Sequence, residues 1–139
     1  MKNLMRGLAA LALALSGSAH ALQQGVTSGD RSYLSGGVSE EEREAMNAQR
    51  ERFSLWVVTA LRRSGEYLSA VRLTVTDAQQ HIVFDEALDG PWLLIDLPIG
   101  KYTIEARFDG QAQQRATTIH AGDHHQAIFY FVALEGGSK

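Results

Sequence analysis

The chain has 139 residues, enough for one domain, and it carries 13 Lys and Arg against 16 Asp and Glu, with five His and no Cys. The lack of cysteine excludes disulfide bonds, thiolate metal sites, a cysteine nucleophile and a lipid-modified cysteine. A hydrophobic content of 45% is that of an ordinary globular protein and argues against disorder throughout.

Residues 1–21 have the organisation of a cleavable secretory signal peptide. Lys2 and Arg6 supply the positive charge, an apolar run follows from Leu8 to Leu15, and the segment ends in Ala19-His20-Ala21, a small-x-small cleavage site. The apolar run is too short to cross a bilayer, which takes about 20 residues. We therefore expect cleavage, and a mature protein in the periplasm or, alternatively, secreted.

The mature chain is acidic. Loss of Lys2 and Arg6 with the signal reduces the 13 basic residues to 11, against 16 acidic ones. This balance argues against nucleic acid, whose phosphates are bound mainly by Lys and Arg, and against an anionic lipid surface. The mature chain has no apolar segment of spanning length, so we expect no membrane span.

Residues 22–37 are rich in Gly, Ser and Gln and predict an irregular lead-in. Residues 38–52 predict an acidic, amphipathic segment with a helix over 40–52. Ser39 and Glu42 have the spacing of a capping box, in which the hydroxyl accepts from a backbone N–H and the Glu side chain reaches back. Acidic residues fill the first turn, and Arg50 and Arg52 lie near the other end, as the helix dipole favours.

The apolar face of this helix is thin and consists of Ala45, Met46, Ala48 and Phe53. We therefore expect a helix on the domain surface with its charges in solvent. Whether it packs on the rest of the domain or projects from it stays open at this point.

From Phe53 onward the hydrophobic period changes to two, which is typical of strands. Asp109-Gly110 is a strong signal for a two-residue hairpin. With no helix between them, the strands should be mainly antiparallel. Residues 53–133 therefore predict a seven-stranded antiparallel Greek-key sandwich, with a barrel as the alternative, and 134–139 predict a polar tail. The seven strands are expected at 53–61, 71–76, 81–84, 92–97, 101–108, 112–119 and 125–132.

The turn Leu97-Pro-Ile-Gly-Lys-Tyr102 has a physical interpretation of its own. Pro98 fixes φ, Gly100 permits a positive φ, and Tyr102 begins a strand with its side chain facing inward. Its hydroxyl is in a position to tie down a corner of the sandwich.

Three segments, Gly65–Asp77, Asp89–Leu94 and Leu97–Ala106, resemble the carboxypeptidase regulatory-like domain, one of the transthyretin-like (prealbumin-like) sandwiches. The resemblance covers roughly residues 53–133. The chain is also similar to small exported bacterial proteins that place Ser-Gly-Gly and an acidic helix before such a domain. These resemblances imply the transthyretin-like fold and a non-catalytic accessory or binding module.

One transthyretin-like branch hydrolyses 5-hydroxyisourate and ends in Tyr-Arg-Gly-Ser. Here the last strand ends Tyr130-Phe-Val-Ala133, without the Arg, Gly and Ser. The resemblance therefore does not extend to that activity.

Histidines are the best candidates for a site. His120, His124 and His125 flank a turn that contains Asp123, and imidazole suits zinc, copper or nickel. Only one of the adjacent His124 and His125 can point to a given face of a strand, which leaves two His and Asp123. Structural zinc takes four ligands, so we expect surface histidines in a turn and no metal or other cofactor.

No catalytic set is apparent. Asp85, Glu86 and Asp89 cluster beside a Gly-Pro turn, where turn chemistry explains Asp89, and the EF-hand spacing is absent. The chain contains neither the G-x-S-x-G motif of serine hydrolases nor a phosphate-binding loop. We therefore expect a protein that is not an enzyme, with no catalytic, cofactor-binding or metal-binding residues.

Aromatic side chains offer one more possibility, a carbohydrate platform. Trp56, Trp92, Tyr67 and Tyr130 are the candidates, and Trp92 is expected in the core, since aromatic residues dominate small cores.

The leading hypothesis is an exported, non-enzymatic sandwich that binds a protein or a cell-envelope component through its edge strands. A small-molecule, carbohydrate or metal binder is the alternative, and a transthyretin-like hydrolase ranks third.

Overall fold

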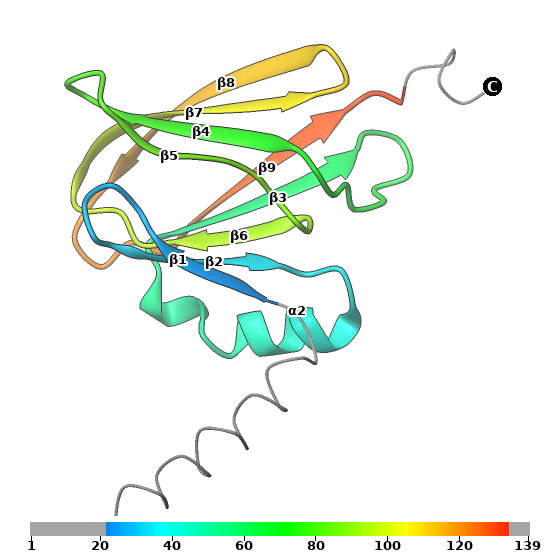
Figure 1. Cartoon of the computed structure of the whole chain (residues 1–139), viewed down its shortest axis with the longest axis horizontal. Helices are drawn as coiled ribbons and strands as arrows, with labels where there is room; N and C mark the ends of the chain where they lie inside the picture. The colour runs from blue at the N-terminus through cyan, green and yellow to red at the C-terminus, as the bar shows by residue number, and fades with distance from the viewer. Residues whose placement is uncertain (1–21, 134–139) are drawn as a thin grey trace, which may run out of the picture.

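A computed structural model describes residues 22–133, which form two stacked β-sheets with one helix packed outside the first (Figure 1). The predicted signal peptide at 1–21 and polar tail at 134–139 lie outside these residues. No helix within 22–133 is long and apolar enough to cross a membrane.

The first sheet has five strands in the order β1-β2-β6-β3-β9. They span Gln23–Val26 (β1), Ser32–Gly36 (β2), Trp92–Ile95 (β6), Leu55–Leu61 (β3) and His125–Phe131 (β9). The second sheet has four strands in the order β5-β4-β7-β8. They span Ile82–Ala87 (β5), Arg72–Asp77 (β4), Gly100–Phe108 (β7) and Gln111–Ile119 (β8).

Strand pairing is mainly antiparallel, as predicted. The exception among the described residues is β3 with β9, which run parallel with Leu55 opposite His125 and Leu61 opposite Phe131. Parallel neighbours need a long connection. Here the connection contains five strands. The chain passes through β4 and β5 in the second sheet, returns to the first sheet in β6, and passes through β7 and β8 in the second sheet before it reaches β9.

The main core lies between the two sheets. Strands β3 and β6 alternate between this core and a second one, so both of their faces are buried. This explains their nearly continuous apolar sequences, LWVVTAL and WLLI. The main core includes Leu55, Val57, Leu73, Val75, Leu93, Ile95, Ile104, Ala106, Phe129 and Phe131.

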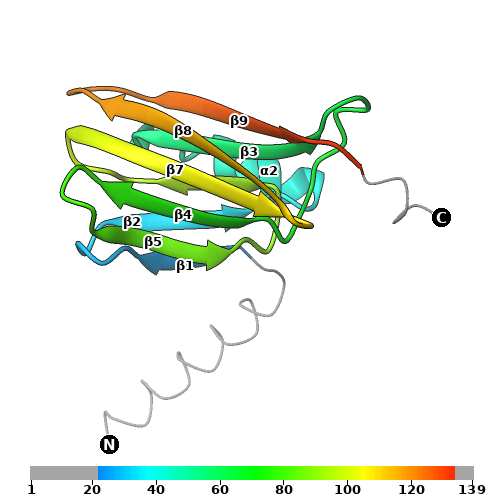
Figure 2. The ribbon, with the colours of Figure 1, turned by 90° about the horizontal axis from the view of Figure 1, so that it is seen from above.

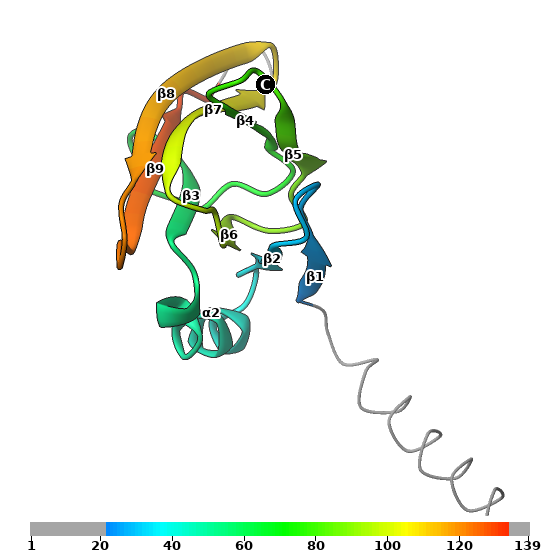
Figure 3. The same cartoon turned by 90° about the vertical axis from the view of Figure 1, so that its left-hand side faces the viewer.

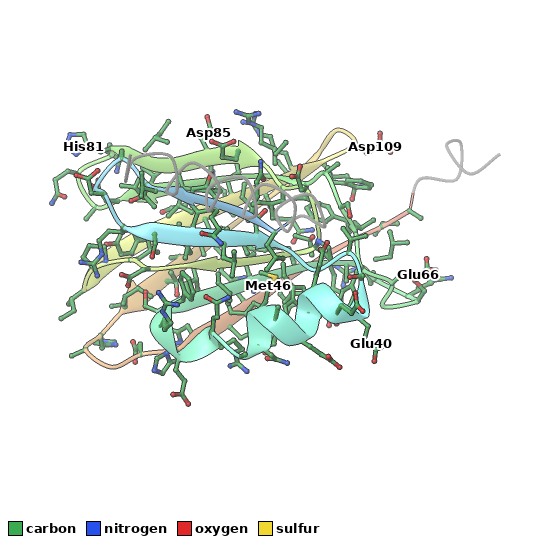
Figure 4. All side chains as sticks on the ribbon, turned by 60° about the horizontal axis from the view of Figure 1, so that its bottom comes forward. Glu40, Met46, Glu66, His81, Asp85 and Asp109 are labelled. Carbon is green, nitrogen blue, oxygen red and sulfur yellow. The ribbon has the colours of Figure 1, made fainter. Side chains whose placement is uncertain are left out.

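The second core lies between the first sheet and helix α2 (Glu40–Asn47). Met46 is fully buried there, on the side of the helix that faces the sheet (Figure 4). Trp92 is 5% exposed in the same cluster, which confirms its predicted place in the interior. The question left open by the sequence is therefore answered: the helix packs on the sandwich.

The predicted irregular lead-in is wrong, because residues 22–37 contain β1 and β2, which raises the number of strands from seven to nine within 22–133. Strand β2 pairs with β6, so the hairpin extends the first sheet. The buried residues of β2 include Ser35 and Gly36, which have no apolar side chain and so give no strand signal in the sequence. Gly36 is close-packed, since a Cβ atom on Gly90 would overlap its carbonyl group.

The helix is shorter than predicted. It ends at Asn47, and Arg50 and Arg52 belong to a separate 3-10 turn (Arg50–Arg52), so they do not neutralise the end of α2. The N-terminal cap is as expected on one side, where Ser39 Oγ accepts from the Glu42 N–H at 3.1 Å. On the other side Glu42 accepts from the N–H groups of Gly37 and Val38, at 3.0 Å each, instead of from Ser39.

Two predicted turns are confirmed. Asp109 and Gly110 connect β7 to β8 with φ of 53° and 80°, the positive values that a type I′ hairpin requires. Tyr102, 7% exposed, donates its hydroxyl to the Pro98 carbonyl at 2.8 Å and so ties down the corner before β7.

Candidate functional site

The histidine turn joins the two sheets at one end of the molecule, between β8 and β9. The Asp123 N–H donates to the His120 carbonyl at 3.1 Å, and Gly122 adopts a φ of 79°, which favours glycine. The turn therefore brings residues 120 and 123 together by its own backbone geometry.

Three donor groups converge in this turn. Asp123 Oδ2 lies 3.3 Å from His120 Nδ1 and 3.3 Å from His125 Nε2. One ligand atom from each of the three residues lies within 4.8 Å of the other two. The set is the one that the sequence analysis arrived at, two His and Asp123, and Asp123 lies between the two imidazoles.

Electrostatics favour the ionised form of Asp123. The hydrogen bond from the His120 backbone N–H is the largest cause that lowers the pKa of Asp123, and the nearby imidazoles of His125 and His120 lower it further. Desolvation opposes these effects. The turn therefore presents a carboxylate anion between two imidazoles.

His124 takes a different direction from His125. Its Nδ1 lies 2.9 Å from the Phe53 carbonyl oxygen, and the His125 backbone N–H donates to the Ser54 carbonyl at 2.9 Å. These contacts hold the start of β9 against the segment before β3. As predicted, one histidine of the pair joins the cluster, and it is His125, the first residue of β9.

Of the acidic residues Asp85, Glu86 and Asp89, the first forms an ion pair with Arg72. Asp85 lies on β5 and accepts from Arg72 Nε at 3.0 Å and from Thr74 Oγ1 at 3.1 Å, on the outer face of the second sheet (Figure 4). The bond from Arg72 is the main cause that lowers the pKa of Asp85. This carboxylate is thus committed to a surface ion pair.

Three of the four aromatic candidates pack edge-on in one cluster around Trp92. Trp92 is buried, and Trp56 meets it edge-on with ring centroids 4.9 Å apart, beneath the guanidinium of Arg50. Tyr67 also meets Trp92 edge-on, at 6.2 Å. A sugar stacks on an open ring face, so this edge-on packing gives a carbohydrate platform little support.

The two sheets meet along two seams. At the first, β8 lies beside β9 (Figure 3), and glutamine side chains close the gap. Gln113 Nε2 donates to the Tyr130 carbonyl, while Gln111 donates to the Val132 carbonyl at 2.9 Å and accepts from its N–H at 3.4 Å. Strand β9 is an edge strand of the first sheet. These side-chain amides bond backbone groups at its C-terminal end, on the side where no strand within residues 22–133 pairs with it.

At the second seam, β1 lies beside β5 (Figure 2), and hydrogen bonds join them at one end. Ser28, in the turn after β1, donates its N–H to the Val83 carbonyl at 3.1 Å. A cleft of about 220 Å³ lies at this seam, with Tyr33 among its lining residues. Val26 and Ile82 line it with exposed fractions of 63% and 54%.

Sequence reasoning missed both seams. The sequence predicts no strand in residues 22–37 and so does not single out Val26, Ser28 and Tyr33. The signal for the other seam was present in β8, where the alternate residues Gln111 and Gln113 are polar at positions that face the interior of the sandwich.

Comparison with models of protein families, with curated proteins and with solved structures finds no match to this chain. The case for a function therefore rests on the geometry of the chain itself.

Proposed function

We propose that the protein is an exported, non-enzymatic binding module of the cell envelope, and that it holds an extended segment of a partner protein in the cleft between β1 and β5. The observation that carries this proposal is the contrast between the two seams. Side chains close the seam at β8 and β9, whereas the seam at β1 and β5 exposes apolar side chains between two edge strands.

An edge strand offers unpaired backbone N–H and C=O groups, and proteins that do not use such edges usually cover or charge them. An extended peptide can pair with these groups and place alternate side chains in pockets of the acceptor. Val26 and Ile82 provide apolar surface for such side chains, and the ring of Tyr33, packed edge-on against Phe84 at 4.8 Å, provides a firm wall.

Charge favours a basic partner segment. Glu86 lies on the rim of the cleft beside Asp85, whose charge Arg72 already balances. The mature chain as a whole carries more acidic than basic residues. Complementary charge accelerates encounter and selects among partners, so a Lys or Arg beside the apolar anchors is expected in the bound segment.

The transthyretin-like assignment and the Greek-key path are part of the same proposal. Apart from β1 and β2, the seven strands divide into β6-β3-β9 and β5-β4-β7-β8, the number and grouping into two sheets that a small sandwich needs. This division differs from the immunoglobulin arrangement, in which the first, second, fifth and fourth strands share a sheet. The Pro98–Tyr102 corner supports the resemblance at its most specific segment.

The experiment is site-specific photo-crosslinking in the producing cells. A crosslinking amino acid at Ile82 should capture one partner, identified by mass spectrometry, through an extended segment. The same crosslinking amino acid in place of Gln114, an exposed residue of β8, should capture no partner. The N-terminus of the recovered protein should be Leu22.

Substitutions provide the matched test. Val26→Asp and Ile82→Asp should abolish co-isolation of the partner, because a charge in the cleft disfavours apolar side chains. Ile99→Asp, at a position 69% exposed and outside the cleft, should leave it unchanged. The proposal is contradicted if the crosslinking amino acid at position 82 captures no partner. It is also contradicted if both Val26→Asp and Ile82→Asp still co-isolate the partner.

A further inference from the structure

We propose that His120, Asp123 and His125 bind a divalent first-row transition-metal ion, with zinc and copper as the favoured class. This inference is independent of the proposed function, because the turn contributes no residue to the cleft between β1 and β5.

Spacing is the first argument. Ligand atoms about 2.1 Å from a tetrahedral metal ion lie about 3.4 Å from one another. Asp123 Oδ2 lies 3.3 Å from His120 Nδ1 and 3.3 Å from His125 Nε2, so two of the three ligand separations already fit. The third is at most 4.8 Å, and rotation of exposed imidazoles can shorten it.

Donor chemistry decides the class of ion. Two imidazole nitrogens and one carboxylate oxygen suit zinc, copper and nickel, whereas calcium and magnesium prefer sites made of oxygen atoms alone. Copper stands highest in the general order of affinity among the divalent ions of this row. The site is therefore expected to discriminate strongly against magnesium.

The backbone prearranges these donors. The His120 N–H donates to Asp123 Oδ2 and orients the carboxylate, which keeps further lone pairs for a metal ion. The His125 N–H is bonded to the Ser54 carbonyl, so the start of β9 is fixed. Little backbone order has to be gained when a metal binds.

The site is open to solvent. The side chains of His120 and His125 are 72% and 46% exposed, and His120 and Asp123 border a cavity of about 300 Å³. Three protein ligands leave at least one position to water or to a donor from outside. His120 directly follows β8 of the second sheet, and His125 is the first residue of β9 in the first sheet. A metal bound to both residues therefore links the two sheets.

The test is a titration of the full chain, purified without a polyhistidine tag, with Zn²⁺ and in parallel with Mg²⁺. We expect one Zn²⁺ per chain and no binding of Mg²⁺. The melting temperature should rise with Zn²⁺ concentration, because a ligand of the folded state stabilises it. His120→Ala, His125→Ala and Asp123→Asn should each lower the Zn²⁺ affinity at least about tenfold, since even residues behind the ligands contribute 10–100-fold.

His81→Ala is the matched control. His81 Nδ1 lies 3.5 Å from Asp77 Oδ2, a similar exposed His–Asp pair that lacks the second imidazole of the turn. This substitution should leave the affinity unchanged. An equal loss from His81→Ala, or full affinity in both His120→Ala and His125→Ala, overturns the proposal and marks the binding as adventitious.

Electron paramagnetic resonance of the Cu²⁺-loaded unsubstituted protein gives a second readout that does not depend on how the variants fold. The spectrum should show two imidazole nitrogens on the metal. One imidazole, or none, overturns the assignment, as does absence of Zn²⁺ binding at millimolar concentration.

Discussion

At the scale of single residues, one hydroxyl group secures the corner between β6 and β7. Tyr102 is 7% exposed, belongs to the main core, and donates its hydroxyl to the carbonyl of Pro98, four residues earlier. Burial raises the pKa of Tyr102, so the hydroxyl stays protonated and remains a donor. The sequence predicts this contact because Pro98 sets the turn and period two points Tyr102 inward.

Tyr102→Phe should lower the free energy of unfolding by about 1 kcal/mol, the usual net contribution of one hydrogen bond. Tyr130→Phe removes a hydroxyl from a side chain that is 39% exposed and should change stability by less than about 0.5 kcal/mol. Urea unfolding of the two variants measures both. Equal effects would show that the Pro98 contact is not what stabilises the corner.

Neighbouring histidines show where residue-level prediction stops. Alternation along a strand states that His124 and His125 point to different faces, but not which of them joins His120. The choice depends on the Phe53 carbonyl, 71 positions away in the chain, which attracts His124 and leaves His125 beside Asp123.

At the scale of elements, α2 is attached to the first sheet chiefly through Met46, its one buried residue. Apart from exposed Ala45, the other residues of the helix are charged or polar, so its docking depends on the contact of Met46 with the second core. The 3-10 turn that follows brings Arg50 over the ring of Trp56, at 4.1 Å from its centroid. The break after Asn47 thus places the arginine on the aromatic ring instead of at the end of the helix.

Met46→Ala should cost roughly 2–5 kcal/mol, because it removes a fully buried side chain and leaves a cavity between helix and sheet. Tryptophan fluorescence should change with it, since Trp92 lies in the same cluster. Thermal unfolding followed by circular dichroism measures the loss. Ala45→Ser, on the exposed side of α2, serves as control, and an equally small effect of Met46→Ala would mean that the helix is not held by this side chain.

Strands β1 and β2 could not be predicted from the pattern of apolar residues in the sequence. Strand β1 is mostly exposed, and β2 is buried at three consecutive residues, Leu34 to Gly36, so neither shows the alternation of apolar residues that identified β4 and β7. The hairpin is stabilised by pairing with β6, and Gly90, which has no side chain, permits the close approach of the Gly36 backbone. Such tertiary support leaves no local signature in the sequence.

At the scale of the whole molecule, three aspartates make the free energy of unfolding depend on pH in the acidic range. The pKa values of Asp77 and Asp123 are lowered mainly by hydrogen bonds from backbone N–H groups, and that of Asp85 mainly by an arginine. A carboxyl group with a lowered folded-state pKa stabilises the fold above its ordinary pKa, 3.8, and loses this contribution as pH falls through the folded-state value.

At the alkaline end, burial raises the pKa values of Tyr33 and Tyr102 above the ordinary 10.0. Their contribution is complete below pH 10 and is lost as pH rises through the folded-state values. Urea midpoints measured across pH should therefore form a plateau between these limits, falling below pH 4 and above pH 10. A midpoint that stays constant from pH 4 to pH 2 would contradict the predicted role of the aspartates.

By itself, the sequence determined the elements whose signals are local: the seven strands β3 to β9, which are apolar or alternating segments between turn residues, the cap of α2 at Ser39, and the turns at Asp109-Gly110 and Pro98. Each depends on residues within a few positions of one another. Tertiary structure alone decided the β1–β2 hairpin, the parallel pair β3–β9, the glutamine-closed seam and the cluster of His120, Asp123 and His125. These depend on contacts between segments far apart in the chain, which local periodicity does not encode.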